Sequence, residues 1–233
     1  MSLYSFIIKI VSFIMTVTIV VARYKENLDW LKPLATSCKF IVYNKGEDDV
    51  DPFFKHVIKL PNVGREGHSY IHHIITNNTK LDDVTVFTQG DIMDHKDQGY
   101  TPLEYLQLCI DTARSHPTGV SQNAHSIEYN ISLYWFNVCN CNDSQTVGPY
   151  EAGLPLGRWL EDCSGKKQSC TQTRWHHGGI FAATRKALLG VPKDRWIAFL
   201  ETLSYHINPA TGHYLERSWY SILTRVFNQQ MIL

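Results

Sequence analysis

Short apolar runs alternate with amphipathic stretches along the first two-thirds of the chain. The runs at residues 16–21 (TVTIVV), 39–43 (KFIVY) and 84–88 (VTVFT) are dominated by β-branched and aromatic residues, which predicts buried strands. Residues 56–60 are predicted to form a shorter strand. This alternation predicts an α/β fold, a single domain whose central sheet is mostly parallel and flanked by helices.

Helical periodicity appears between these runs. Apolar residues at helical spacing predict a helix over residues 65–77, and a short helix is expected over 27–34. Residues 101–104 (TPLE) predict the start of a helix that runs to about residue 114. Thr is a preferred N-cap, Pro fits the first helical position, and Glu closes a capping box.

The last third of the chain predicts more helix than strand. A strand over residues 179–183 leads into a short helix from Thr184, and helices are expected over 192–205 and 213–229. Residues 131–138 are strand-like. The stretch 140–175 is polar and rich in Gly, Pro and Ser, which indicates an irregular loop that is either functional or disordered.

The length of 233 residues predicts one domain. We assign residues 1–15 to an apolar N-terminal segment and residues 16–233 to the α/β domain, with halves at 16–115 and 116–233. Two interpretations of the apolar segment stay open. It is either a membrane anchor, close to the ~20 residues that a span requires, or a segment packed on the domain. The protein is membrane-anchored and Golgi-lumenal in the first case and cytoplasmic in the second.

The charge balance argues against nucleic acid as a partner. The 22 Lys and Arg residues equal the 22 Asp and Glu residues, and the basic residues are dispersed along the chain. Binding to a phosphate backbone needs a basic stripe or patch, which this sequence lacks. We therefore expect no nucleic-acid partner.

Polar residues follow three of the predicted strands, where ligands of open α/β sheets collect. Arg23 and Tyr24 follow the first strand, Lys45 follows the second, and Gln89, Gly90 and Asp91 follow the run at 84–88. A divalent cation held by side-chain oxygens neutralises the closely spaced charges of a diphosphate. Asp91 suits this role, although an isolated Asp after a glycine more commonly caps a turn.

Five segments carry a resemblance to a known family. They are VVARYKENLDWL (20–31), LPNVGREGHSYIHHII (60–75), VTVFTQGDIMDH (84–95), GGIFAATRKALL (178–189) and HYLERSWYSI (213–222). Together they resemble a family catalogued as a domain of unknown function, found in fungi, algae, protists and large DNA viruses. That family is similar to the GT-A glycosyltransferases, including chlorella-virus glycosyltransferase domains.

The resemblance implies a GT-A-like domain with a nucleotide-sugar binding first half and an acceptor-binding second half. The implied activity is transfer of a sugar from a nucleotide donor, a uridine diphosphate (UDP) sugar, to a hydroxyl of a glycan or glycoprotein acceptor. The implied cofactor is Mn²⁺ or Mg²⁺. Gln89, Gly90 and Asp91 would occupy the place of the GT-A Asp-x-Asp motif. The first position departs from that motif, because Gln brings no negative charge.

Four further residues of the first half are candidates for binding the donor. Arg65 and Glu66 begin a predicted helix, where Arg suits an anionic group and Glu suits a ribose or sugar hydroxyl. Arg23 and Tyr24 would contact the diphosphate and the base. The competing interpretations are a capping pair for Arg65 and Glu66, and solvated loop residues for Arg23 and Tyr24.

The second half supplies the remaining candidates. Gly178 and Gly179 would line the donor, and His177 would complete the metal shell with Asp91 and Gln89. Glu216 is the candidate catalytic base. His213 lies one helical turn before Glu216 and is a further metal-ligand candidate. The alternatives are structural histidines and an ion pair between Glu216 and its neighbour Arg217.

Two rival functions stay open. A metal-dependent hydrolase of a phosphoester or a sugar nucleotide could use Asp91, Asp94, His95 and His177. An inactive sugar-binding module is the other rival, and the Gln at position 89 favours it. Neither rival would transfer a sugar to an acceptor.

Overall fold

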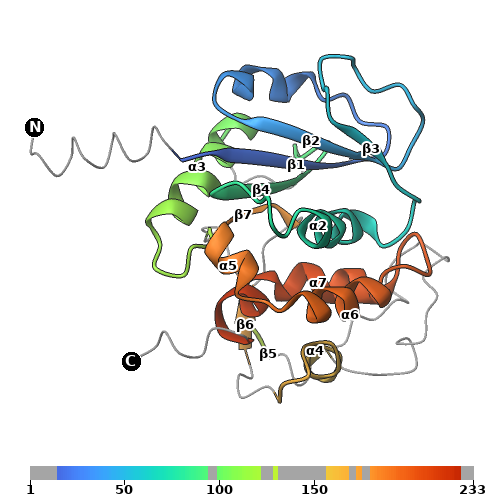
Figure 1. Ribbon diagram of the computed structural model, residues 1–233, viewed down its shortest axis with the longest axis vertical. Helices are drawn as coiled ribbons and strands as arrows, with labels where there is room; N and C mark the ends of the chain where they lie inside the picture. Colours follow the sequence, from blue (N-terminus) through green and yellow to red (C-terminus); the bar gives the residue numbers. More distant parts are fainter. Residues whose placement is uncertain are drawn as a thin grey trace, which may run out of the picture.

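The computed structural model describes residues 15–93, 99–121, 128–130, 156–167, 172–174 and 179–226. At its centre is a five-stranded sheet with strand order β3-β2-β1-β4-β7 (Figure 1). The strands are β1 (Val17–Arg23), β2 (Lys39–Asn44), β3 (Val57–Lys59), β4 (Val84–Gln89) and β7 (Phe181–Thr184). Strands β1 to β4 are mutually parallel, whereas β7 runs antiparallel to β4.

The sheet confirms the prediction of an α/β fold with a mostly parallel sheet flanked by helices. The four predicted strands of the first half are present to within two residues at each end. The reversed direction of β7 is a finding of the structure, because the hydrophobic pattern of a single strand is the same in either direction.

Helices cover both faces of the sheet (Figure 1). The 3₁₀ helix η1 (Asp29–Thr36) and α3 (Pro102–Ser115) cover one face, while α2 (Arg65–Thr76) and α7 (Ala210–Ser221) cover the other, and α6 (Lys193–Glu201) packs against α2. Strand residues alternate between the two hydrophobic cores. Ile19 and Val21 pack with the η1 and α3 side, and Val20 packs with the α2 and α7 side.

The core on the α2 and α7 side is built around aromatic rings. Phe87 and Phe181 of the sheet lie 4.9 Å apart between ring centroids. Trp219 of α7 lies 4.9 Å from Phe181, and Tyr70 of α2 lies 5.1 Å from Phe87. These fully buried rings fix α2 and α7 against the sheet.

The predicted capping box of α3 is confirmed. The Thr101 hydroxyl accepts a hydrogen bond from the Glu104 amide, and the Glu104 carboxylate accepts one from the Thr101 amide at 2.8 Å. Helix α7 begins at Ala210, three residues before its predicted start, with Pro209 as its N-cap. A π-helical turn, η4 (Ile222–Val226), follows it directly.

The expectation of an irregular loop over 140–175 is wrong for part of that stretch. Residues 156–164 form helix α4 (Leu156–Ser164), which buries Leu156, Trp159, Leu160 and Cys163. These four positions have helical spacing, which the surrounding Gly, Pro and Ser residues obscure. Residues 131–138 and most of the expected loop lie outside the described residues.

Three short elements complete the described structure. Helix α5 (Arg185–Leu189) follows β7, and β5 (Glu128–Asn130) pairs antiparallel with β6 (Gln172–Arg174). Across the described ranges, no helix is both long and apolar enough to cross a bilayer. Residues 1–14, which contain nearly all of the expected apolar segment, lie outside those ranges.

Candidate functional site

The order in which the chain adds strands to the sheet reverses between β1 and β4. The chain passes from β1 outward to β2 and β3, and then returns across β1 to form β4 on its other side. At such a point the connections from the two neighbouring parallel strands lead in opposite directions. A crevice then opens beyond the carboxyl ends of these strands. The carboxyl ends of β1 and β4 are Arg23 and Gln89.

A cavity of about 290 Å³ lies at this point, and we call it the switch-point cavity. Residues from the ends of β1, β2 and β4, from the start of α2 and from the loop before α7 surround it. Its lining consists of Ala22, Arg23, Tyr24, Glu26, Lys45, Asn62, Arg65, Glu66, Gln89, Ile207 and Asn208. The cavity therefore brings together five of the predicted donor-binding residues: Arg23, Tyr24, Arg65, Glu66 and Gln89.

Arg23 is buried and already engaged by protein groups. Its guanidinium donates to the Glu26 carbonyl at 2.9 Å and the Asn44 side-chain oxygen at 3.1 Å, and it pairs with Asp49 at 2.8 Å. These contacts tie the loop after β1 to the loop after β2. Arg23 thus holds the wall of the cavity and adds positive charge beneath it.

Lys45 supplies a second buried cation. Its ammonium donates hydrogen bonds to the carbonyl oxygens of Val63 and Arg65, the two residues that flank Gly64. Burial lowers the pKa of Lys45 to about 8, although the nearby Glu66 carboxylate acts in the opposite direction. Lys45 is therefore mostly charged at neutral pH and close to its titration point.

Arg65 begins α2 in an unusual backbone conformation. Gly64 and Arg65 both have positive φ angles, 63° and 50°, and such angles are uncommon for a residue with a side chain. The Arg65 guanidinium lies against His213 of α7, with Nη1 2.8 Å from Nδ1. Strained backbone at the edge of a cavity is typical of a functional site.

Glu66 is the acid next to this cationic group. Its carboxylate forms an ion pair with Arg65, with 3.5 Å between Oε2 and Nε. Among the described residues, this is the one ion pair or hydrogen bond of the Glu66 carboxylate. Gly179 packs against it, since a Cβ on Gly179 would lie 3.4 Å from Glu66 Oε1. The structure therefore brings Gly179, another predicted donor-binding residue, to the same place. Oxygen lone pairs of Glu66 stay available to a hydroxyl of a ligand.

Tyr24 stands at the mouth of the cavity with 49% of its surface exposed. Its backbone is fixed by the loop after β2, because a Cβ on Gly46 would lie only 1.5 Å from the Tyr24 carbonyl oxygen. The two loops can approach this closely only because residue 46 is glycine. An exposed ring on a fixed backbone suits stacking against a planar ligand.

Asp91 lies beside a different cavity, of about 490 Å³, that Trp30, Met93 and Glu26 also line. One of its carboxylate oxygens accepts a hydrogen bond from the Met93 amide at 2.9 Å, as the turn-capping interpretation expects. The loop that leads from β4 to Asp91 is fixed by Trp30, whose indole N–H donates a hydrogen bond to the Gly90 carbonyl at 2.8 Å.

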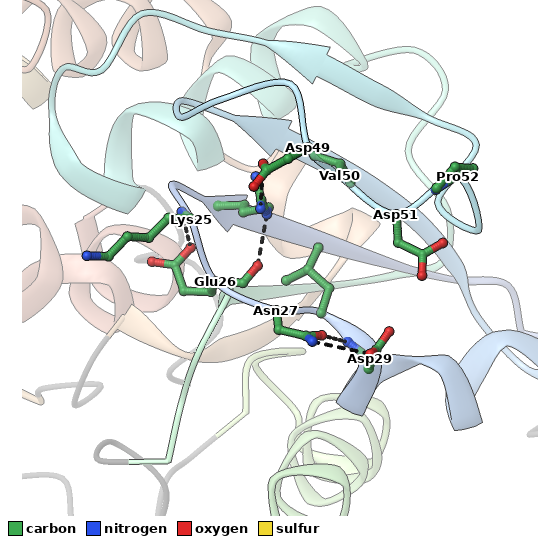
Figure 2. A pocket seen from close by; sticks show the side chains of 10 residues that line it. Lys25, Glu26, Asn27, Asp29, Asp49, Val50, Asp51 and Pro52 are labelled. Carbon is green, nitrogen blue, oxygen red and sulfur yellow. Dashed lines mark hydrogen bonds and ion pairs between the residues drawn. The ribbon is translucent and has the colours of Figure 1, made fainter.

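A third cavity, of about 420 Å³, adjoins the other two on the side of the β2–β3 loop (Figure 2). Figure 2 shows Asn27 and Asp29 on one side of it and Asp49, Val50, Asp51 and Pro52 on the other. Arg23 and Glu26 line both this cavity and the switch-point cavity. The two spaces are thus neighbours that share a charged wall.

Glu26 lines all three cavities, although the sequence did not indicate it as a site residue. Its carboxylate accepts hydrogen bonds from the amides of Tyr24 at 2.7 Å and Lys25 at 3.1 Å. A Cβ on Gly90 would lie 2.8 Å from the same oxygen. Its position two residues after a strand-end Tyr was the available signal, whereas Asn62 and Asn208 gave none.

Glu216 and His213 lie on α7. The Glu216 carboxylate is buried and lies 3.4 Å from Arg217 Nη1, as the ion-pair alternative expects. Burial, together with Arg65 and Arg217, lowers the pKa of His213 to about 3. The imidazole is neutral but faces a guanidinium, which opposes a metal ion there. The predicted role of His213 as a metal ligand stays a prediction.

The other two predicted metal ligands within the described ranges line different cavities. Gln89 lines the switch-point cavity and Asp91 the 490 Å³ cavity. No group of three or more His, Cys, Asp or Glu side chains in those ranges could hold a metal ion. His177, Gly178, Asp94 and His95 lie outside the described residues, so their predicted roles stay predictions.

Comparison with known proteins agrees with part of the resemblance. The family described as "Protein of unknown function (DUF3431)" matches residues 19–110. This match confirms the resemblance to a domain of unknown function over that segment. No curated protein and no solved structure matches the chain.

Proposed function

We propose that the protein is a glycosyltransferase that binds a nucleotide sugar, a UDP sugar, in the switch-point cavity and transfers its sugar to a hydroxyl of a glycan. One observation carries this proposal: Arg23, Lys45 and Arg65 converge on a cavity at the switch point of the sheet. Three cations around one small cavity suit a ligand with several negative charges, such as a diphosphate.

The three cations differ in what they can do. Arg23 and Lys45 are buried and donate to protein oxygens, so they act mainly through their charge. Arg65 is partly exposed and is the cation best placed for direct hydrogen bonds to phosphate oxygens. Stabilising the departing diphosphate lowers the barrier to breaking the bond between sugar and phosphate.

The rest of the lining supports a nucleoside and a sugar beside the diphosphate. Tyr24 offers a ring for the base, and the adjoining 420 Å³ cavity offers room and polar side chains for the nucleoside. Glu66, Asn62 and Asn208 offer oxygen and nitrogen atoms to hydroxyl groups. This mixture of charged, amide and aromatic groups suits a nucleotide sugar better than a simple anion.

A divalent metal stays part of the proposal through Asp91, with Gln89 as a neutral ligand beside it. Asp91 would hold it with its second carboxylate oxygen, and the metal would add positive charge near the diphosphate. Because the described residues form no complete metal site, the charge of the departing diphosphate is proposed to be stabilised by the protein's own cations. We propose Glu66 as the base, because it lines the switch-point cavity and, unlike Glu26, accepts no hydrogen bond from a described backbone amide. Glu216 stays the alternative candidate for the base.

Binding and turnover measurements test the proposal. The protein is titrated with UDP-glucose and a panel of other nucleotide sugars by calorimetry, with Mn²⁺ and with chelator, and then assayed with and without glycan acceptors. We expect binding of at least one nucleotide sugar and product formation that requires an acceptor. Equal hydrolysis without acceptor would favour the hydrolase, and binding without turnover the inactive module. Failure of every nucleotide sugar to bind would contradict the proposal.

A further inference from the structure

Lys45 is buried at the edge of the switch-point cavity, and its ammonium contacts the turn that begins α2. Its side chain is 8% exposed, and its ammonium donates to the carbonyls of Val63 and Arg65. An ammonium has three N–H donors, so two of them are used on this turn. The Lys45 side chain thus spans from the end of β2 to the start of α2.

The turn is also held from its opposite side. The Gly64 amide donates to the His206 carbonyl at 2.7 Å, and the Arg65 amide donates to the Ile207 carbonyl at 3.2 Å. A side chain at position 64 would collide with Leu203 and His68 at 2.7–2.8 Å. Backbone groups of the loop before α7 therefore bind the amides of the turn, while Lys45 binds its carbonyls.

This arrangement bears directly on Arg65. Its φ of 50° is a conformation that a residue with a Cβ adopts only when its surroundings impose it. The hydrogen bond from Lys45 to the Arg65 carbonyl is one such constraint, and the bond from its amide to Ile207 is another. The direction of the Arg65 side chain follows from this backbone conformation.

We propose that Lys45 is a positioning residue: its ammonium holds Arg65 in the left-handed conformation that presents the guanidinium to the switch-point cavity, so anion binding in that cavity is coupled to the protonation of Lys45. This inference rests on the proposed function, because it takes the nucleotide diphosphate to be the anion. The diphosphate and the ammonium stabilise each other, and binding is then favoured by the charged form of Lys45.

The coupling has a definite sign and a pH range. Burial places the pKa of Lys45 at about 8, so the amine is half neutral there in the free protein. An anion next to it raises this pKa, and binding near pH 8 takes up a proton. Affinity therefore falls as the pH rises, by about fivefold to tenfold between pH 7 and pH 9 for one such proton.

The histidines near Lys45 do not contribute to this pH dependence. His68, on α2, has a pKa lowered to about 4 by burial, by Lys45 and by His72, so its ring is neutral throughout this range. His213, across Arg65, has a pKa of about 3 and is neutral as well. The remaining titratable side chains of the cavity are Arg23, Tyr24, Glu26, Arg65 and Glu66.

The test uses the full chain and UDP-glucose with Mg²⁺ in a calorimeter. At pH 8 the binding enthalpy is measured in buffers of different ionisation enthalpy, which reports proton uptake, and the affinity is compared at pH 7 and pH 9. We expect proton uptake and the stated loss of affinity for the wild type. Lys45→Met should bind at least about tenfold more weakly at pH 7 and show no proton uptake.

The control is Lys80→Met, which removes an exposed lysine between α2 and β4 and should behave like the wild type. A buffer-independent enthalpy with equal affinity at both pH values would overturn the coupling even if Lys45→Met did not fold. A folded Lys45→Met that binds like the wild type would also overturn it. If the wild type bound none of the panel of nucleotide sugars at either pH, the proposed function itself would fail.

Discussion

Glu66 and Glu216 lie on neighbouring helices that pack together, and their exposed fractions are nearly equal, 9% and 7%. Burial raises the pKa of Tyr70, which lies between them, and both carboxylates add to this effect. The two acids nevertheless differ in what surrounds them. Glu66 lines the switch-point cavity, whereas Glu216 forms an ion pair with Arg217, the next residue in the sequence.

The difference shows that burial of an acid does not by itself identify a functional residue. A buried carboxylate with a cation partner is satisfied within the protein. Removing its charge leaves the cation buried without a counter-charge, which lowers the stability of the fold. A buried carboxylate at a cavity with spare lone pairs can instead accept a hydrogen bond from a ligand. The predictions below separate these two conditions.

The largest effect is expected for Glu66→Gln. The substitution keeps the shape of the side chain and removes the charge that would accept a proton or bind a hydroxyl at the reacting centre. Loss of a general base typically lowers turnover by about 10²–10⁴-fold. Steady-state kinetics with saturating donor measure this, and thermal unfolding checks the fold. Turnover within threefold of wild type would assign the reacting carboxylate elsewhere, with Glu216 as the next candidate.

Arg65→Gln should reduce affinity for the nucleotide sugar by about 10–100-fold, the loss expected for a hydrogen bond to a charged group. Calorimetry at fixed ionic strength measures the change. Arg158→Gln provides the matched control, because Arg158 is an exposed residue of α4 whose ion pair is with Asp162. Equal affinities for both variants would remove Arg65 from the binding site.

Glu216→Gln should act on stability. Arg217 would lose its carboxylate partner at a largely buried position, and we expect a loss of about 1–3 kcal/mol in the free energy of unfolding. Chemical denaturation measures this loss, and turnover per folded molecule should stay close to wild type. A stable variant with strongly reduced turnover would instead support Glu216 as the catalytic base.

The smallest effect on the fold is expected for Asp91→Asn, because Asp91 is an exposed loop residue. If Asp91 holds a metal, the substitution should abolish the gain in donor affinity that Mn²⁺ gives, while the midpoint of thermal unfolding changes little. Gln89→Ala should have a weaker effect on this gain, since only a neutral ligand is lost. Undiminished metal-dependent binding by Asp91→Asn would remove the metal from the proposal.

Much of the first half could be predicted from the sequence, because its strands are short β-branched runs and its helices have clear starting signals. The same reasoning placed Arg23, Lys45 and Gln89 at strand ends, and parallel strands bring such ends to one edge of the sheet. The position of Arg65 beside them depends on the strained turn at Gly64, which no local pattern indicates.

The second half was less predictable for physical reasons. Helix α4 is short and is flanked by Gly, Pro and Ser residues that mask its four buried positions. In the first half, nothing in the sequence indicated that Gln89 and Asp91 would line two different cavities, where Glu26 and Trp30 from the segment after β1 lie against Gly90 between them. Spacing along the chain carries no information on such an approach.

The pairing of β4 with β7 has a consequence for the assembly of the protein during synthesis. The residues that pair, such as Val84 with Thr184, are separated by about half of the chain. Until β7 leaves the ribosome, the buried strand β4 has one open edge, and an open edge of a hydrophobic strand recruits other chains. The segment at 19–110 that matches the family contains most of β1 and all of β2, β3 and β4, but ends well before β7. We therefore expect a nascent or truncated chain of that length to expose the open edge of β4 and to aggregate unless the remaining sequence or a chaperone covers that edge.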